Sequence, residues 1–164
     1  MDKLVKRSQK VAFYGVPGTS STTYHRMTGF TELSKSANPK EYSRQYVDED
    51  YERSDVVGYS PEYSYGFDLF EDSAVHADIA AIADEEKVGA DAIRDIIVVD
   101  MTGEGGTSGS FAAVKRGFAV IPDSEGDSTD AYTYSGSLKA NGSRIVGTAT
   151  SADGWQTVTF TEKE

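Results

Sequence analysis

An alternation of apolar and polar residues between Tyr59 and Leu69 constrains the fold of this chain more than any other feature. In the stretch DVVGYSPEYSYGFDLF, residues 55–70, large apolar residues occupy every second position from Tyr59 onward. Successive side chains of a β-strand point to opposite faces, so the pattern predicts a strand with one buried face. The other face carries small residues and acids, and its last four positions are Glu62, Ser64, Gly66 and Asp68.

The formal net charge of −11 is distributed unevenly along the chain. Residues 1–40 hold seven lysines and arginines against two acids, residues 41–100 hold four against seventeen, and residues 101–164 hold five against eight. The middle of the chain is strongly acidic, and nucleic-acid phosphates are repelled by such a surface. Sequence-reading DNA or RNA binding is therefore disfavoured, although nucleic acid could pass such a surface without adhering to it.

Length and residue types favour one cytoplasmic domain over residues 1–164. A chain of 164 residues is long enough to bury a core. The absence of cysteine excludes disulfides and thiolate metal sites. The start MDKLVKRSQK lacks the apolar run of a signal peptide, and no window approaches the roughly 18 apolar residues of a membrane span. We therefore expect a cytoplasmic, soluble product.

Most of the sequence predicts strands. Short apolar or alternating runs bounded by glycine, proline or polar clusters are typical of strands. The run 92–101 is nearly continuous in apolar residues, which indicates a central strand covered on both faces. The expected strands are 10–17, 25–33, 41–47, 62–70, 92–101, 110–122, 131–140, 143–150 and 155–161.

An acidic loop over residues 48–61 is expected to join two antiparallel strands, 41–47 and 62–70. A loop of this length is unusual in a compact domain, and such loops usually have a function. A basic N-terminal arm, residues 1–10, leads into the first strand. Both segments are candidates for contacts with neighbouring molecules.

The segment 71–89 predicts one helix that lies against a sheet. Asp72 or Ser73 can cap its first turn, and Gly89 lies just past its expected end. Its apolar stripe at helical spacing consists of Val75, Ile79, Ile82 and Ala83.

Two glycine dipeptides predict turns in the last third of the chain. Asn141-Gly142 and Asp153-Gly154 each lie between two expected strands. Both residues of an Asn-Gly pair accept the positive φ of a type I′ hairpin turn. We therefore expect the last three strands to form an antiparallel meander.

No arrangement of residues points to catalysis or to a cofactor. His25 follows a loop rich in serine and threonine, but no G-x-S-x-G motif supports a nucleophile there. His76 is expected to be a partly exposed structural residue in the first helical turn. The glycine-rich segment 102–110 lacks the Gly-Lys-Ser/Thr sequence of a phosphate-binding loop. We expect no enzymatic activity.

The acidic segment 123–130 offers oxygen ligands of the kind that calcium prefers. Its acids are Asp123, Glu125, Asp127 and Asp130. The glycine falls at position 126 and no glutamate closes the loop, so the spacing departs from the EF-hand pattern. A solvated acidic turn is the favoured interpretation, with calcium binding as the alternative.

Several segments together resemble the tail tube proteins of bacteriophages. Residues 41–72 resemble the long lumen hairpin of that family, and the helix-to-strand passage 75–101 and the terminal segment 134–150 also look like theirs. The resemblance covers most of residues 5–161, and its motifs are structural rather than chemical. It implies a mainly β fold of the α+β type, in which two packed antiparallel sheets form a β-sandwich or barrel with one flanking helix, a long hairpin loop and an N-terminal arm.

The resemblance also implies a function. Tail tube proteins are structural virion proteins that assemble into hexameric rings, and these rings stack into a hollow tube. The implied partners are further copies of the chain, the tape measure protein, and the tail terminator and distal tail proteins. Double-stranded DNA passes through the tube during ejection without sequence-specific binding. The implied location is the virion tail, assembled in the host cytoplasm, with no membrane contact.

Two groups of residues acquire candidate roles from this resemblance and from the charge distribution. If the tyrosine face of 62–70 packs into the core, Glu62, Ser64, Gly66 and Asp68 point into the lumen, where an acidic wall keeps DNA from adhering. The alternative is that this face is simply solvated. Opposite charges would register stacked rings if the arm approaches the acidic loop of a neighbour. The residues concerned are Lys3, Lys6, Arg7 and Lys10 in the arm and Asp48, Glu49, Asp50 and Glu52 in the loop.

A second class of function remains open at this stage. The chain could be an isolated β-sandwich module that binds carbohydrate or protein on a phage or bacterial surface appendage. Its binding surface would consist of the exposed aromatic residues Tyr132, Tyr134 and Trp155. Self-association separates the two classes, because a tube subunit carries segments that become ordered only on its neighbours.

Overall fold

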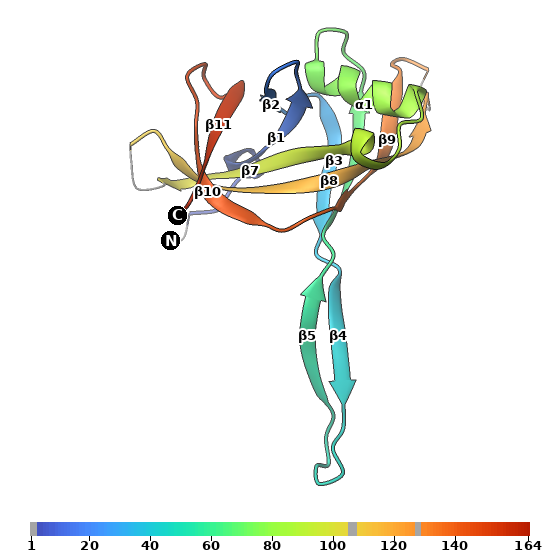
Figure 1. The fold of residues 1–164 in the computed structure, drawn as a ribbon, viewed down its shortest axis with the longest axis vertical. Coiled ribbons are helices and arrows are strands. Elements are labelled where there is room, and N and C mark those ends of the chain that lie inside the picture. The colour runs from blue at the N-terminus through green and yellow to red at the C-terminus, as the bar shows by residue number, and fades with distance from the viewer. Residues whose placement is uncertain (1–2, 105–107, 127–128) are drawn as a thin grey trace.

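The computed structural model describes residues 3–104, 108–126 and 129–164, without the side chain of Glu104. A body of curved strands with one helix carries a long hairpin that projects away from it (Figure 1). The helices are α1 (Ala74–Asp84) and two short 3-10 helices, Arg7–Gln9 and Gly89–Ala92. The strands are β1 (Lys10–Pro17), β2 (Thr22–Arg26), β3 (Phe30–Ser36), β4 (Pro39–Arg44), β5 (Arg53–Tyr59), β6 (Glu62–Asp68), β7 (Ile93–Glu104), β8 (Phe111–Glu125), β9 (Thr133–Ala140), β10 (Ile145–Thr150) and β11 (Thr157–Glu162). No helix of the described residues is long and apolar enough to cross a membrane.

Six strands close into a barrel. They run in the order β10-β11-β2-β1-β7-β8, and β10 also pairs with β8, which closes the ring. Each of these pairs is antiparallel. One face of every strand points inward and fills the barrel with a first core, whose buried residues are Val11, Phe13, Ile97, Val99, Ala113, Ala149 and Val158.

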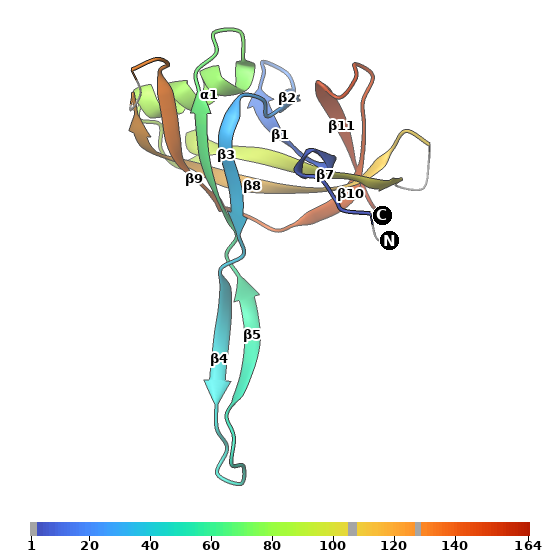
Figure 2. The ribbon, with the colours of Figure 1, turned by 180° about the vertical axis from the view of Figure 1, so that it is seen from behind.

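Strand β8 is long enough to serve two parts of the sheet. Residues 111–115 pair with β10 inside the barrel, whereas residues 118–125 pair with β9, which continues to β6 and β3. The layer formed by β3, β6 and β9, together with α1, encloses a second core against the outer face of β1, β7 and β8 (Figures 1 and 2). Ala12 and Tyr14 of β1 belong to this outer core, whereas Val11 and Phe13 belong to the first.

This architecture confirms the expected mainly β fold of packed sheets and barrel with one flanking helix. Strand β7 lies in the middle of the sheet and contributes to both cores, as its continuous apolar run predicts. The predicted helical stripe is also confirmed, since Val75, Ile79 and Ile82 are at most 1% exposed.

Buried polar contacts fix α1 against the barrel. The Oγ of Ser73 caps the helix by accepting a hydrogen bond from the backbone N–H of His76. Asp78 accepts hydrogen bonds from the hydroxyl of Tyr14 at 2.5 Å and from Nε of Arg94 at 2.8 Å. Burial, and then the neighbouring carboxylate, raise the pKa of Tyr14. Because a buried carboxylate without its cation is costly, Arg94 and Asp78 hold each other in place.

The prediction of an acidic loop over 48–61 was wrong. Strand β5 lies within this segment and pairs with β4 from Pro39↔Tyr59 to Arg44↔Arg53. The predicted strands 41–47 and 62–70 are therefore not partners, because β6 pairs with β3 and β9 instead. The acidic residues lie in the connection between β4 and β5. The alternation of apolar and polar residues that begins at Tyr59 does not belong to one strand, because β5 ends in the hairpin at Tyr59 and β6 begins in the body at Glu62.

Two other connections also differ from the sequence predictions. The expected strand 25–33 is divided between β2 and β3, since Gly29 adopts a φ of 75° and turns the chain. The expected three-strand meander is wrong, because β9 and β10 each pair with a different half of β8 and not with each other. Asn141-Gly142 is a corner in which only Gly142 has positive φ, so no type I′ turn forms. The turn at Asp153-Gly154 does join paired strands, β10 and β11.

His76 is structural, as predicted, but it is fully buried rather than partly exposed. Its Nδ1 accepts a hydrogen bond from the backbone N–H of Phe70, and its Nε2 donates to the carbonyl of Thr28 at 2.8 Å. The ring stacks on Phe67 with a centroid separation of 4.3 Å. The neutral imidazole thus ties the β2–β3 connection to the start of α1. Burial lowers its pKa, against smaller raising effects from Thr28, Asp72 and Asp68.

Lowering the pH is expected to destabilise the protein through His76. Its pKa is lowered in the folded state, so the unfolded chain binds a proton that the folded chain does not. The stabilisation is fully present above about pH 6.5, the ordinary histidine pKa, and is lost as the pH falls through the folded value. Thermal unfolding between about pH 7.5 and about pH 5.5 should show a fall in Tm for the wild type and for the control His25→Gln, and a smaller fall for His76→Gln. A wild-type Tm that is constant over this range would contradict the prediction.

Candidate functional surfaces

The face of β6 opposite the tyrosines is the first candidate functional surface. Tyr63, Tyr65 and Phe67 are at most 8% exposed and belong to the outer core, which confirms the middle of the predicted buried face. Tyr59 and Leu69, at the two ends of that face, are exposed instead. The side chains of Glu62, Ser64 and Asp68 are half-buried on the opposite face. Gly66 is buried, and a Cβ there would lie 3.4 Å from Oγ1 of Thr31.

Neighbouring strands extend this face with similar residues. Residues paired directly across antiparallel strands point to the same side of a sheet. Ser64 pairs with Ser34 of β3 and with Ser137 of β9, and Glu62 pairs with Ser36 and Lys139. The polar face, as we name it, consists of Glu32, Ser34, Ser36, Glu62, Ser64, Gly66, Asp68, Thr133, Ser135, Ser137 and Lys139. It is a surface of low bulk, with three acids and one lysine.

The hairpin of β4 and β5 is the second candidate surface. It forms a separate two-stranded sheet and extends away from the body in both views (Figures 1 and 2). An isolated two-stranded hairpin is at best marginally stable in water. This one also exposes large apolar side chains, namely Tyr42, Tyr46, Val47, Tyr51, Val56, Val57 and Tyr59. A hairpin of this kind is typical of a segment that is covered by another molecule.

The tip of the hairpin, residues 45–52, carries the acids singled out in the sequence. Glu49 accepts a hydrogen bond from Nε of Arg53 at 2.8 Å, so its charge is compensated within the hairpin. Asp48, Asp50 and Glu52 have no ion-pair partner among the described residues. Val47, which directly precedes Asp48, is fully exposed. The tip therefore presents uncompensated negative charge around an apolar side chain.

The basic arm lies against the barrel rather than near the hairpin tip. Arg7 donates to the carbonyl of Lys10 at 2.5 Å and to that of Leu33 at 3.3 Å, and Nζ of Lys10 lies 3.9 Å from Asp100. Lys3 and Lys6 are exposed. Since the tip points away from the body (Figure 1), the predicted pairing of arm and acids does not occur within one chain.

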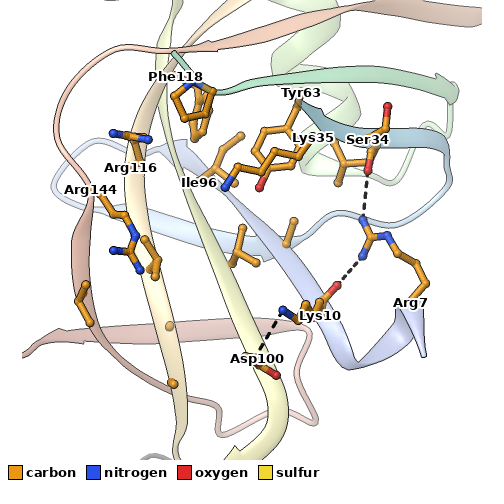
Figure 3. A pocket seen from close by; sticks show the side chains of 18 residues that line it. Arg7, Lys10, Ser34, Lys35, Tyr63, Ile96, Asp100, Arg116, Phe118 and Arg144 are labelled. Carbon is orange, nitrogen blue, oxygen red and sulfur yellow. Dashed lines mark hydrogen bonds and ion pairs between the residues drawn. The ribbon is translucent and has the colours of Figure 1, made fainter. Parts of the chain in front are cut away.

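A pocket of about 730 Å³ lies at the foot of the hairpin and was missed by sequence reasoning. Its floor is apolar and includes Ile96, Val98 and Val114 of the central strands. Five basic side chains and one carboxylate line it, namely Arg7, Lys10, Lys35, Arg116, Arg144 and Asp100. Arg116 and Arg144 lie on one side and Arg7 on the other (Figure 3). The alternation of Val114, Arg116 and Phe118 was a weak sequence signal for one wall of the pocket. The five basic residues come from four separate segments, which only the fold brings together.

The remaining sequence candidates do not form a site among the described residues. No group of three or more histidine, aspartate or glutamate side chains there is arranged to hold a metal ion. Glu125 accepts a hydrogen bond from the hydroxyl of Tyr132 at 2.7 Å, while Asp127 lies outside the described residues. The proposed aromatic carbohydrate surface is wrong, because Tyr134 is buried and Trp155 packs between Phe13 and Phe111.

Comparison with protein-family models and with curated protein sequences gave no match. Comparison with solved structures gave a chain from the tail of an empty GTA particle with C6 symmetry, with a TM-score of 0.59 and 13% identity over 86% of this chain and 97% of that chain. Chains from the six-fold symmetrised baseplate and from the tube-terminating cap of the anti-feeding prophage match with TM-scores of 0.46 and 0.45, at 7% and 16% identity. These two matches cover 89% and 92% of this chain and 97% and 94% of the others.

At such low identity the GTA match establishes a shared fold and nothing finer. The match extends over almost all of the GTA tail chain and most of the present one. The resemblance to tail tube proteins is thereby confirmed as a likeness in fold. The chain has the fold of a phage-like tail protein.

Proposed function

We propose that this chain is the subunit of a phage-like tail tube, which assembles into stacked hexameric rings around a central channel. The observation that carries the proposal is the projecting hairpin. Its apolar side chains are exposed, and Asp48, Asp50 and Glu52 at its tip have no ion-pair partner among the described residues. The fold shared with a C6-symmetric tail supports the same conclusion. In this proposal the chain acts in the virion tail, and the host cytoplasm is where the tail is assembled.

The polar face is the proposed lining of the channel. Its serines, threonine and glycine offer little bulk, and Glu62 and Asp68 add negative charge. DNA that moves along such a wall meets no cationic cluster, and contact with its phosphates is unfavourable. Strand β3 is the last strand of its sheet, so its outer edge is free to pair with a strand of the next subunit.

The proposed partners follow from this arrangement. The first partner is the chain itself, within and between rings. A tape measure protein would occupy the channel during assembly, and tail terminator and distal tail proteins would cap its two ends. Double-stranded DNA would pass through the channel without sequence-specific binding.

Concentrated purified protein is expected to form hollow tubes. Negative-stain electron microscopy should show rings of six subunits in end-on views and a repeating stack in side views. Protein that stays monomeric at every concentration, or that forms solid fibres without a channel, would contradict the proposed function.

Reversing the charge of the polar face is expected to slow DNA passage. Glu62→Lys/Asp68→Lys should change the free energy of unfolding by about 0.5 kcal/mol or less, because both side chains are partly exposed. Each ring would then offer new phosphate contacts, whose strength falls with added salt. DNA release from triggered particles should therefore slow most at low ionic strength.

The matched control for this experiment is Glu85→Lys/Glu86→Lys, two exposed acids just past the end of α1. Release from the control should equal that of the wild type at every salt concentration. Wild-type release from intact tubes that carry lysine at positions 62 and 68 would show that these side chains do not face the DNA path.

A further inference from the structure

The outer core of the body is left open at one end. On β1, β7 and β8 the same face that packs under α1 continues past the helix and forms the floor of the pocket. Ile96 and Phe118 belong both to the core cluster and to the pocket lining. Ile96 and Phe118 are buried within the chain, whereas Val98 and Val114 of the same floor are only half-buried, so this apolar part of the central strands is accessible to another molecule.

The rim of this pocket is strongly cationic. Lys10 is 3.9 Å from Asp100, and that is the one ion pair among the five basic side chains within the described residues. Arg7 and Arg116 donate to backbone carbonyls, which leaves their charge uncompensated. Lys35 and Arg144 are exposed. The pocket therefore fits an occupant that combines an apolar group with several carboxylates.

The hairpin tip has this composition. Val47 and the neighbouring Tyr46 and Tyr51 are exposed, and Asp48, Asp50 and Glu52 lack ion-pair partners among the described residues. The tip cannot enter the pocket of its own chain, because the pocket lies at the foot of the hairpin, where Lys35 and Pro61 line it. About nine residues of extended chain separate foot and tip, which is about 30 Å. The hairpin points away over this length (Figure 1).

We propose that the tip of the β4–β5 hairpin of one copy docks into the basic pocket of a second copy. Val47 covers the apolar floor, and the tip carboxylates pair with the basic rim. The proposal deepens the proposed function, on which it rests, by naming the surfaces through which the subunits join. It also differs from the predicted pairing of the arm with the acids of a neighbour. The basic surface that receives the acids now includes Lys35, Arg116 and Arg144 in addition to Arg7 and Lys10.

Such a contact joins two different surfaces, so a pair of subunits joined by one contact still has one free tip and one free pocket. Contacts of this kind generate closed rings or open filaments rather than dimers. The docking also covers Val47 at the hairpin tip together with the apolar floor of the pocket.

Charge exchange between the two surfaces tests the proposal. The pocket variant is Lys35→Glu/Arg144→Glu, the tip variant is Asp48→Lys/Asp50→Lys, and the control is Lys87→Glu/Lys163→Glu, whose side chains do not line the pocket. Each charge variant alone should need at least about tenfold more protein than wild type to assemble, because like charges would then face each other. Mixed in equal amounts, the two should assemble again, since each tip meets an opposite pocket. Sedimentation velocity and native mass spectrometry measure both effects.

The outcomes separate this inference from the proposed function. The docking would be overturned if the pocket variant assembled at the same concentration as the wild type. It would also be overturned if the mixture failed to assemble although both variants were folded. Neither result would contradict the proposed function as a tube subunit. Wild type that does not self-associate would overturn the proposed function itself. If the reversed pocket pair does not fold, Lys35→Gln/Arg144→Gln is expected to raise the assembly threshold in the same direction, and an unchanged threshold would overturn the docking.

Discussion

The structure depends on the burial of both faces of three central strands, β1, β7 and β8. Alternate residues of each strand point into the barrel and into the outer core, so an apolar layer is needed on each side. The barrel provides the inner layer by closing on itself through the pairing of β8 with β10. The outer layer is assembled from α1, β6 and β9, and it extends only part of the way along the strands. The pocket is the part of the outer face that this layer leaves uncovered.

The hairpin and the pocket are complementary in charge, and each exposes apolar groups. The hairpin has exposed apolar and acidic side chains and no layer to pack on. The pocket has an apolar floor and, apart from Lys10, basic side chains without ion-pair partners among the described residues. In a single subunit the hairpin leaves apolar side chains in water, and the pocket leaves basic side chains without counterions. The proposed docking would reduce both unfavourable exposures through one contact. The polar face of β3, β6 and β9 adjoins the pocket at Ser34, and it is the surface that we propose lines the channel.

The sequence predicted those parts of the fold that depend on local periodicity. The strand around Tyr65 and the stripe of α1 follow from spacing, because burial of one face imposes a period of 2 or 3.6. The strand around Ile97 follows instead from its nearly continuous apolar run, because both of its faces are buried. Pairing partners were not predictable in the same way. Asn141-Gly142 has the composition of a hairpin turn but forms a corner, since the long β8 offers two separate edges to β9 and β10. The role assigned to the acids at 48–52 stays a prediction, whereas the basic residues of the pocket come from four separate segments and left only a weak signal at Arg116.

Site-specific cross-linking tests the central claim of this account, that another copy completes the open core. A photoreactive residue in place of Val47 would be activated in assemblies of equal amounts of ¹⁴N- and ¹⁵N-labelled protein, and the cross-linked peptides would be identified by mass spectrometry. The account predicts cross-links between labelled and unlabelled chains, from position 47 to the pocket residues of β7 or β8. Cross-links confined to one chain, or to a surface away from the pocket, would contradict it.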